Sequence, residues 1–290
     1  MRLSSLIKLP VILLQISRCA AFLAGMFVCA YGAAEPLKVA IPGNSGDKNS
    51  DDPSHFFQQL LVLALEKTRL SDGEYVLLYN NHRGGIARDR AMVIADAGID
   101  VVWASATKER EQQMRVVPVD ILKNLNNFRV LLINKNAQSQ FNHVKTLNDL
   151  RKFTVGSVEH WTDGTIMKDN GFNVVATSSY IGLFKMLAAR RFNFLSRGLH
   201  EIGFETRAYK DYALVQEETL LLTYENPARY CYFVNKNNVA LADRIERGLK
   251  IAQQDGSFDT LFNQMSSFKE GEEILKSSYR TLIQIKNSNN

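Results

Sequence analysis

Short apolar runs and apolar positions at helical spacing alternate along the chain from residue 37 onward. The runs predict strands in the first third of the chain over residues 37–41, 75–79 and 99–103. Apolar positions spaced every three to four residues predict a helix that begins at Ser54 and ends near Thr68, and a second one over residues 86–96. This order of elements is the start of an α/β fold with a doubly wound sheet.

The same alternation continues to the C-terminus. Further strands are expected over residues 128–133, 153–158, 173–176, 192–195 and 230–234. The helices between them are expected to begin at Thr146, at Thr162 or Asp163, and at Ser178 or Ser179, and a further helix after the last strand is expected to begin at Ser257. A second α/β unit therefore occupies roughly residues 135–230, and the polar tail from Lys286 is expected to fray.

The strand over residues 99–103 is followed by small residues and then by TKER, residues 107–110. Ligands of open α/β sheets lie beyond the carboxyl ends of the strands, so Trp103, Thr107 and Arg110 are candidates for a ligand site. An arginine fork can give a carboxylate two parallel charge-assisted hydrogen bonds. The alternatives are core packing for Trp103 and an ion pair with Glu109 or Glu111 for Arg110.

His160 and Trp161 lie where a predicted strand meets a helix N-terminus, which is a natural place for an anion. Arg197 follows another strand and is a second candidate anion contact. His160 has no histidine or cysteine at metal-ligand spacing, so no metal site is expected. The sequence contains no nucleophile elbow, phosphate-binding loop or zinc motif, so we expect no catalytic residues and no cofactor.

The first 34 residues are expected to be a cleaved signal peptide. They carry Arg2, Lys8 and Arg18 but no acid, and an apolar run over residues 19–28 precedes small residues; an uncleaved anchor is the alternative. Loss of this segment lowers the formal charge of the 290-residue chain from +5 to +2, and no basic patch predicts binding to nucleic acid. Cys231 is the one cysteine after residue 34, so no internal disulfide is expected.

Four segments resemble the bacterial extracellular solute-binding proteins of family 3, the amino-acid-binding kind used by ABC transporters. They are the strand with TKER, TLNDLRKFTVG (146–156), the helix–strand pair over residues 180–194, and residues 230–265 with NKNN and DGS. The sequences DVVW with ERE, HWTD, SSYIGLF and RGLHEI look like one branch of that family, of transporter substrate-binding proteins. The resemblance covers nearly all of the chain after residue 34.

The resemblance implies a type 2 periplasmic-binding-protein (Venus-flytrap) fold, in which two lobes, each a sheet flanked by helices, are joined by two hinge strands, here residues 128–133 and 230–234. Residues 1–34 would be the signal peptide, 35–133 the first part of lobe 1, 134–231 lobe 2, and 232–290 the second part of lobe 1 with the C-terminal tail. Arg110 matches the arginine with which such receptors bind a ligand carboxylate. The acid that binds the ligand amine has no match; Glu217 and Glu218 are unmatched alternatives.

The sequence therefore predicts a periplasmic, monomeric protein without enzymatic activity that encloses a small polar, carboxylate-bearing solute. Its ligand-binding residues would be Arg110, Thr107, Trp103, Trp161, Arg197 and His160, and its partner an ABC permease or a membrane sensor. The alternatives are an enzyme on the same scaffold, such as a dehydratase of small carboxylic acids using Glu109, Glu159 or His160, and a ligand-free interaction module.

Overall fold

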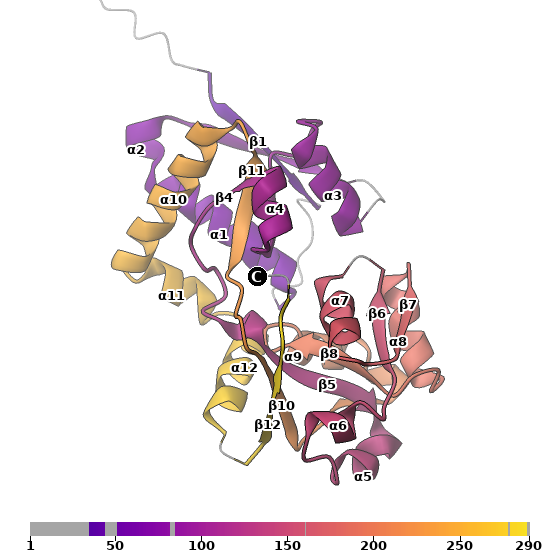
Figure 1. Cartoon of the computed structure of the whole chain (residues 1–290). Coiled ribbons are helices and arrows are strands. Elements are labelled where there is room, and N and C mark those ends of the chain that lie inside the picture. The colour runs from indigo at the N-terminus through magenta and orange to yellow at the C-terminus, as the bar shows by residue number, and fades with distance from the viewer. Residues whose placement is uncertain (1–34, 44–50, 82–84, 160, 278, 289–290) are drawn as a thin grey trace, which may run out of the picture. The chain divides into compact units, whose positions relative to one another are not determined.

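Strand pairing separates the protein into two lobes. The structure, a computed structural model, describes residues 35–43, 51–81, 85–159, 161–277 and 279–288. Within them the strands form a two-stranded, a three-stranded and a seven-stranded sheet. We call the parts built on the two small sheets the first lobe and the part built on the large sheet the second lobe (Figure 1).

In the first lobe, β1 (Leu37–Pro42) pairs in parallel with β2 (Tyr75–Asn80), and β11 (Tyr230–Asn235) lies antiparallel between β3 (Val101–Ser105) and β4 (Met114–Val116). The Asp100 amide donates to the Ala40 carbonyl at 2.8 Å, which places β3 beside β1. The helices of this lobe are α1 (Pro53–Lys67), α2 (Arg69–Asp72), α3 (Gly85–Ile94), α4 (Lys108–Gln113), α10 (Val239–Gln254) and α11 (Ser257–Phe262).

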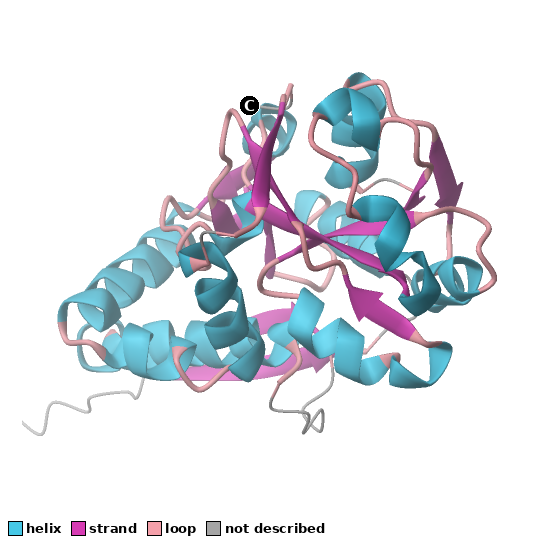
Figure 2. Ribbon diagram, turned by 90° about the horizontal axis from the view of Figure 1, so that it is seen from below, coloured by secondary structure: helices cyan, strands magenta, loops and turns pink. Residues whose placement is uncertain are grey.

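The sheet of the second lobe has the order β12-β10-β5-β8-β6-β7, with β9 also paired to β5. Its strands are β5 (Phe128–Asn134), β6 (Val155–Val158), β7 (Val174–Thr177), β8 (Phe194–Gly198), β9 (Leu214–Gln216), β10 (Leu220–Tyr224) and β12 (Thr281–Ile285). Its helices are α5 (Gln138–Phe141), α6 (Leu147–Leu150), α7 (Thr162–Asp169), α8 (Tyr180–Ala188), α9 (Ile202–Ala208) and α12 (Ser266–Lys276). Helices lie on either side of the strands (Figure 2). The mixed α/β, two-lobed fold confirms the predicted fold class.

Close contacts between helices hold the first lobe together. The N-cap of α1 is Asp52, whose carboxylate accepts from the Ser54 amide, so the predicted cap at Ser54 is wrong by two residues. Helix α10 packs directly on α1 at Gly248. A side chain there would not fit, since a Cβ on Gly248 would lie 1.9 Å from the Ala64 carbonyl oxygen. Phe56 of α1 contacts the rings of Phe258 and Phe262 of α11 and, across to the second lobe, the ring of Phe268 of α12.

Two of the connections between the lobes run side by side. One comprises residues 117–127, between β4 and β5, and the other residues 225–229, between β10 and β11. The Asn127 amide group joins them, because its Nδ2 donates to the Ala228 carbonyl and its Oδ1 accepts from the Ala228 amide, both at 2.9 Å. The expected hinge strands are the strands that follow these connections, and each pairs within a single sheet.

The strand pairing divides the chain differently from the sequence-based boundaries. Residues 128–133, assigned to the first lobe, form most of β5 in the seven-stranded sheet. The C-terminal segment also returns to the second lobe, where α12 packs on α9 and β12 pairs with β10. The tail after β12 is held at its start, because the Lys286 amide donates to Asn170 Oδ1 and Asn287 is buried. Strand β12 has the sequence TLIQI, in which exposed and buried positions alternate. Sequence analysis did not predict this strand, because it lacks a continuous apolar run.

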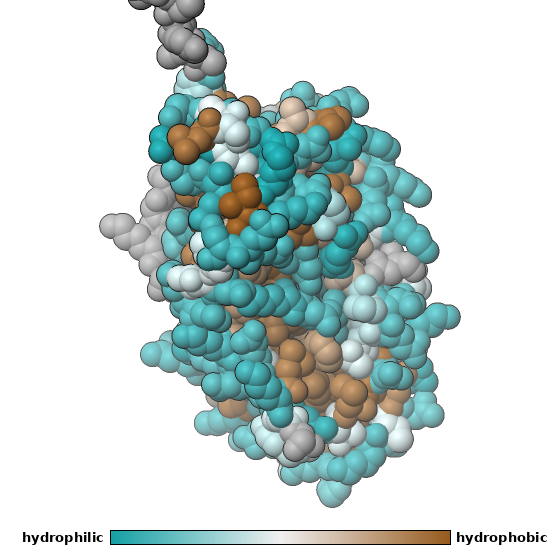
Figure 3. All heavy atoms as spheres, turned by 90° about the vertical axis from the view of Figure 1, so that its left-hand side faces the viewer, coloured by the Kyte–Doolittle hydropathy of each residue, from teal (hydrophilic) through white to brown (hydrophobic). Residues whose placement is uncertain are grey.

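Hydrophilic side chains cover most of the face that carries α10 and α12, and hydrophobic side chains gather on its lower half (Figure 3). Among the described residues no helix is both long and apolar enough to cross a membrane.

Candidate functional site

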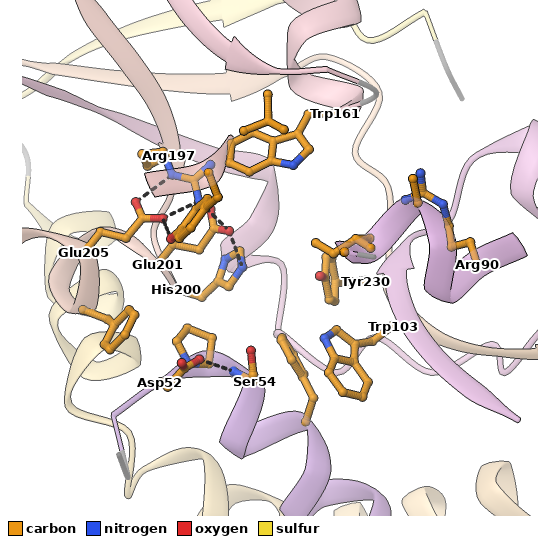
Figure 4. A pocket seen from close by; sticks show the side chains of 18 of the residues that line it. Asp52, Ser54, Arg90, Trp103, Trp161, Arg197, His200, Glu201, Glu205 and Tyr230 are labelled. Atoms are coloured by element: carbon orange, nitrogen blue, oxygen red, sulfur yellow. Dashed lines mark hydrogen bonds and ion pairs between the residues drawn. The ribbon is translucent and has the colours of Figure 1, made fainter. Parts of the chain in front are cut away.

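A cavity of about 530 Å³ lies between the lobes (Figure 4). The first lobe contributes side chains from α1, α3, β3 and β11, and the second lobe contributes side chains from the ends of β6 and β8 and from α8 and α9. The side chains that give this cavity its chemistry are Phe57, Arg90, Trp103 and Tyr230 from the first lobe, and Glu159, Trp161, Tyr180, Arg197, His200, Glu201 and Glu205 from the second.

Aromatic rings form two opposite walls. In the first lobe, Phe57 stacks on Tyr230 with centroids 5.3 Å apart and lies 5.4 Å from Trp103. In the second lobe, the rings of Trp161 and Tyr180 are 6.0 Å apart. Rigid rings on both walls offer a small solute a large contact area.

Arg197 is the centre of the second-lobe wall, and its charge is already compensated. Its guanidinium binds Glu205 through two nitrogens, with Nε 2.7 Å from Oε2, and its Nη2 lies 2.9 Å from Oε1 of Glu201. Burial alone would lower the pKa of Arg197, but the two carboxylates raise it above its ordinary value. The guanidinium lies over the Trp161 ring, with Cζ of Arg197 4.6 Å from the ring centroid. Arg197 therefore presents no free positive charge to a ligand, contrary to the expectation of an anion contact.

The two glutamates are held by further hydrogen bonds. Glu201 accepts from the Gly198 amide at 3.0 Å, and Glu205 accepts from the Tyr180 hydroxyl at 2.8 Å. Burial works to raise the pKa of Glu201, but Arg197 and neighbouring positive charge lower it to about 2. The second-lobe wall is therefore acidic, and it suits a cationic or hydrogen-bond-donating part of a solute.

A second buried ion pair lies behind this wall. Arg129 of β5 pairs with Asp163 of α7, and Asp163 also accepts from the Tyr224 hydroxyl at 2.8 Å. Because Asp163 and Thr162 are engaged with other elements, neither caps α7; the N-cap is Trp161, with no side-chain hydrogen bond. The prediction of a Thr162 or Asp163 cap is therefore wrong.

His200 is buried beside these charges. Its Nε2 lies 3.7 Å from Glu201, and its Nδ1 has no hydrogen-bond partner among the described residues. Burial lowers the pKa of His200 to about 4, so the ring is neutral near pH 7.

Arg110 and Thr107 occupy a different place from the one expected. Thr107 is the buried N-cap of α4, where its hydroxyl accepts from the Arg110 amide. The Arg110 guanidinium donates to the Ser105 carbonyl at 2.8 Å and, across the lobes, to the Thr162 hydroxyl at 2.7 Å. Neither residue is among those that line the cavity.

Of the predicted ligand-binding residues, the structure thus brings Trp103, Trp161 and Arg197 together in the cavity wall. His160 lies outside the described residues. Glu217 lies away from the cavity, where it is fully buried and accepts from the amides of Thr219 and Leu220.

Sequence reasoning missed Arg90, Tyr230, His200, Glu201 and Glu205. The spacing of Glu201 and Glu205, four and eight residues after Arg197, was a usable signal for two carboxylates facing one guanidinium. No such local signal exists for Arg90, because α3 and β3 meet only in the fold. The part of the chain that the structure describes contains no cluster of three or more residues able to hold a metal ion.

Comparison with known proteins identifies the architecture. No protein-family model matches the sequence, and no curated protein matches it. Among solved structures, an ancestral arginine-binding protein bound to glutamine is 16% identical, with a TM-score of 0.60 over 79% of this chain and 98% of that one. A histidine kinase sensor domain similar to periplasmic binding proteins is 14% identical, with a TM-score of 0.60 over 80% and 96%. The substrate-binding protein of an amino acid ABC transporter is 14% identical, with a TM-score of 0.57 over 79% and 99%. At these identities the likeness shows the two-lobed fold of periplasmic binding proteins and no more.

Proposed function

We propose that this protein is a periplasmic solute-binding protein, akin to family 3, that captures a small polar, amino-acid-like solute between its lobes. The observation that carries the proposal is the cavity of about 530 Å³, which has aromatic rings on both walls. Pockets of this size and lining enclose small molecules. The solute would pass to an ABC permease or signal to a membrane sensor, and the protein would act as a monomer without a cofactor.

The charges of the cavity support a solute that carries both signs. Glu201 and Glu205 line the second-lobe wall, and Arg90 lines the first-lobe wall. A zwitterion can satisfy both walls at once, whereas a simple anion would face the two carboxylates. The open cavity also argues against the ligand-free interaction module, which would fill this space with its own side chains.

Export to the periplasm belongs to the proposal as well. It rests on the leader-like residues 1–34, which lie outside the described residues.

The test is a thermal-shift screen of the protein from Glu35 onward against amino acids, small carboxylates, polyols and short peptides. A ligand that binds the folded state raises the melting temperature as its concentration exceeds its dissociation constant. A hit that is recovered unchanged after incubation supports a receptor, whereas conversion of the hit to a product would establish the enzyme. Absence of any shift across the panel would contradict the proposal.

A further inference from the structure

Arg90 lines the cavity and has no partner among the residues that the structure describes. It lies on α3, and Figure 4 shows it on the same side of the cavity as Trp103 and Tyr230. Within the described ranges, no hydrogen bond or ion pair engages its guanidinium. Two fully buried arginines of the protein are compensated, because Arg129 pairs with Asp163 and Arg197 with two glutamates.

The surroundings of Arg90 favour an anion. Burial lowers its pKa, and the negative charges of Glu109 and Asp89 oppose this only in part. Burial and the like charge of Arg90 lower the pKa of Arg110 to about 10, so the two guanidinium groups repel each other. A carboxylate placed against Arg90 would offset this repulsion and use hydrogen-bond donors that are otherwise unsatisfied.

Arg110, in contrast, has its donors engaged. It reaches the Ser105 carbonyl within its own lobe and the Thr162 hydroxyl in the other lobe. These contacts hold the guanidinium outside the cavity wall and connect the lobes directly.

We infer that Arg90 binds the carboxylate of the solute, while Arg110 joins the two lobes through Thr162. The inference rests on the proposed function and deepens it, because it assigns the anionic subsite to α3 of the first lobe. The solute would lie with its carboxylate at Arg90 and its cationic or hydrogen-bond-donating part towards Glu201 and Glu205.

Paired probes that differ only in the carboxylate test this assignment. Isothermal titration would compare L-arginine with agmatine, L-lysine with cadaverine, and L-glutamate with 4-aminobutyrate, which lacks the α-carboxylate. In the wild-type protein the amino acid should bind more tightly than its decarboxylated partner by about 10- to 100-fold, as loss of charged hydrogen bonds implies.

Arg90→Gln should remove that preference. It should weaken binding of the amino acid by about the same factor and change binding of the decarboxylated partner by no more than about threefold. Arg110→Gln should weaken both members of a pair equally and so keep the preference. Arg88→Gln, an exposed arginine on the same helix, should change neither. Circular dichroism would confirm folding, and Arg90→Lys, which keeps the charge but not the fork, gives a second variant with an intermediate preference.

The outcomes separate the two proposals. If Arg110→Gln erases the preference and Arg90→Gln keeps it, the assignment of the carboxylate to Arg90 is overturned while the binding function stands. If the wild-type protein binds none of the probes, the amino-acid-like ligand is overturned, and the Arg90 assignment with it.

Discussion

The Arg110 guanidinium of the first lobe donates to the Thr162 hydroxyl of the second lobe, with Nη2 2.7 Å from Oγ1. Arg110 belongs to α4 and Thr162 to the first turn of α7, so this hydrogen bond spans the two lobes. Because the donor is charged and part-buried, this bond favours the arrangement in which the lobes are in contact.

Thr162→Val should shift the protein towards more separated lobes. The substitution keeps the shape of the side chain but removes the acceptor, which weakens the contact by about 1.5–3 kcal/mol. The distance between two spin labels, one in each lobe, would report the change. Thr165→Val, an exposed position on the same helix, is the matched control. Equal distance distributions in wild type and Thr162→Val would exclude this role.

The pair of connections between the lobes should depend on Asn127. Asn127→Ala removes both hydrogen bonds to Ala228 and leaves a buried amide and a buried carbonyl without partners. We expect a loss of about 2–5 kcal/mol in the free energy of unfolding by urea. Asn142→Ala, an exposed asparagine, should change it by less than about 0.5 kcal/mol. A loss as small as that of the control would show that the two connections are held together by other contacts.

The buried charges around Arg197 should be essential for stability as well as for the cavity. Arg197→Gln leaves the buried Glu205 without its positive partner and Glu201 with Arg129 at 3.9 Å, which should lower the free energy of unfolding by about 3–5 kcal/mol. Lys250→Gln breaks the exposed ion pair with Glu246 and should cost less than about 1 kcal/mol. Urea unfolding of the two variants beside the wild type measures both values. Similar small losses would mean that water reaches the Arg197 cluster.

Most of the strands could be predicted from the sequence, since they depend on local patterns, whereas β4, β9, β10 and β12 were not predicted. The apolar run before Trp103 and the strand before Arg197 lead to the cavity in the structure as they do in the prediction. The capping error at α7 has a physical reason. Thr162 and Asp163 have the right side chains to cap α7, but Arg110 and Arg129 compete for them from elements that are distant in sequence.

The chemistry of the site was less accessible, because it depends on contacts between segments that are far apart. The family resemblance directs attention to Arg110, and only the fold shows that its donors are engaged across 52 residues of sequence. The contact between the two connections is also inaccessible to sequence reasoning, because Asn127 and Ala228 are 101 residues apart and nothing in their local sequence predicts their contact.

The last prediction concerns pH and His200. Burial lowers the pKa of this ring to about 4 in the folded protein, whereas an unfolded histidine has its ordinary value of 6.5. Above pH 6.5 the ring is neutral in both states, and its contribution to stability is fully present. Between pH 6.5 and pH 4 the unfolded chain binds a proton that the folded protein does not, so stability falls by about 1.4 kcal/mol per pH unit.

Urea unfolding of the wild type and of His200→Gln at several values between pH 7 and pH 4.5 isolates this contribution. The variant should be less stable than the wild type at pH 7. Because glutamine does not titrate, the difference in the free energy of unfolding between the two proteins should shrink by about 2–3 kcal/mol at pH 4.5. His143→Gln, at an exposed histidine, is the matched control substitution. A gap between wild type and His200→Gln that stays constant with pH would show that the pKa of the ring is the same in the folded and unfolded states, with Glu201 at 3.7 Å offsetting the effect of burial.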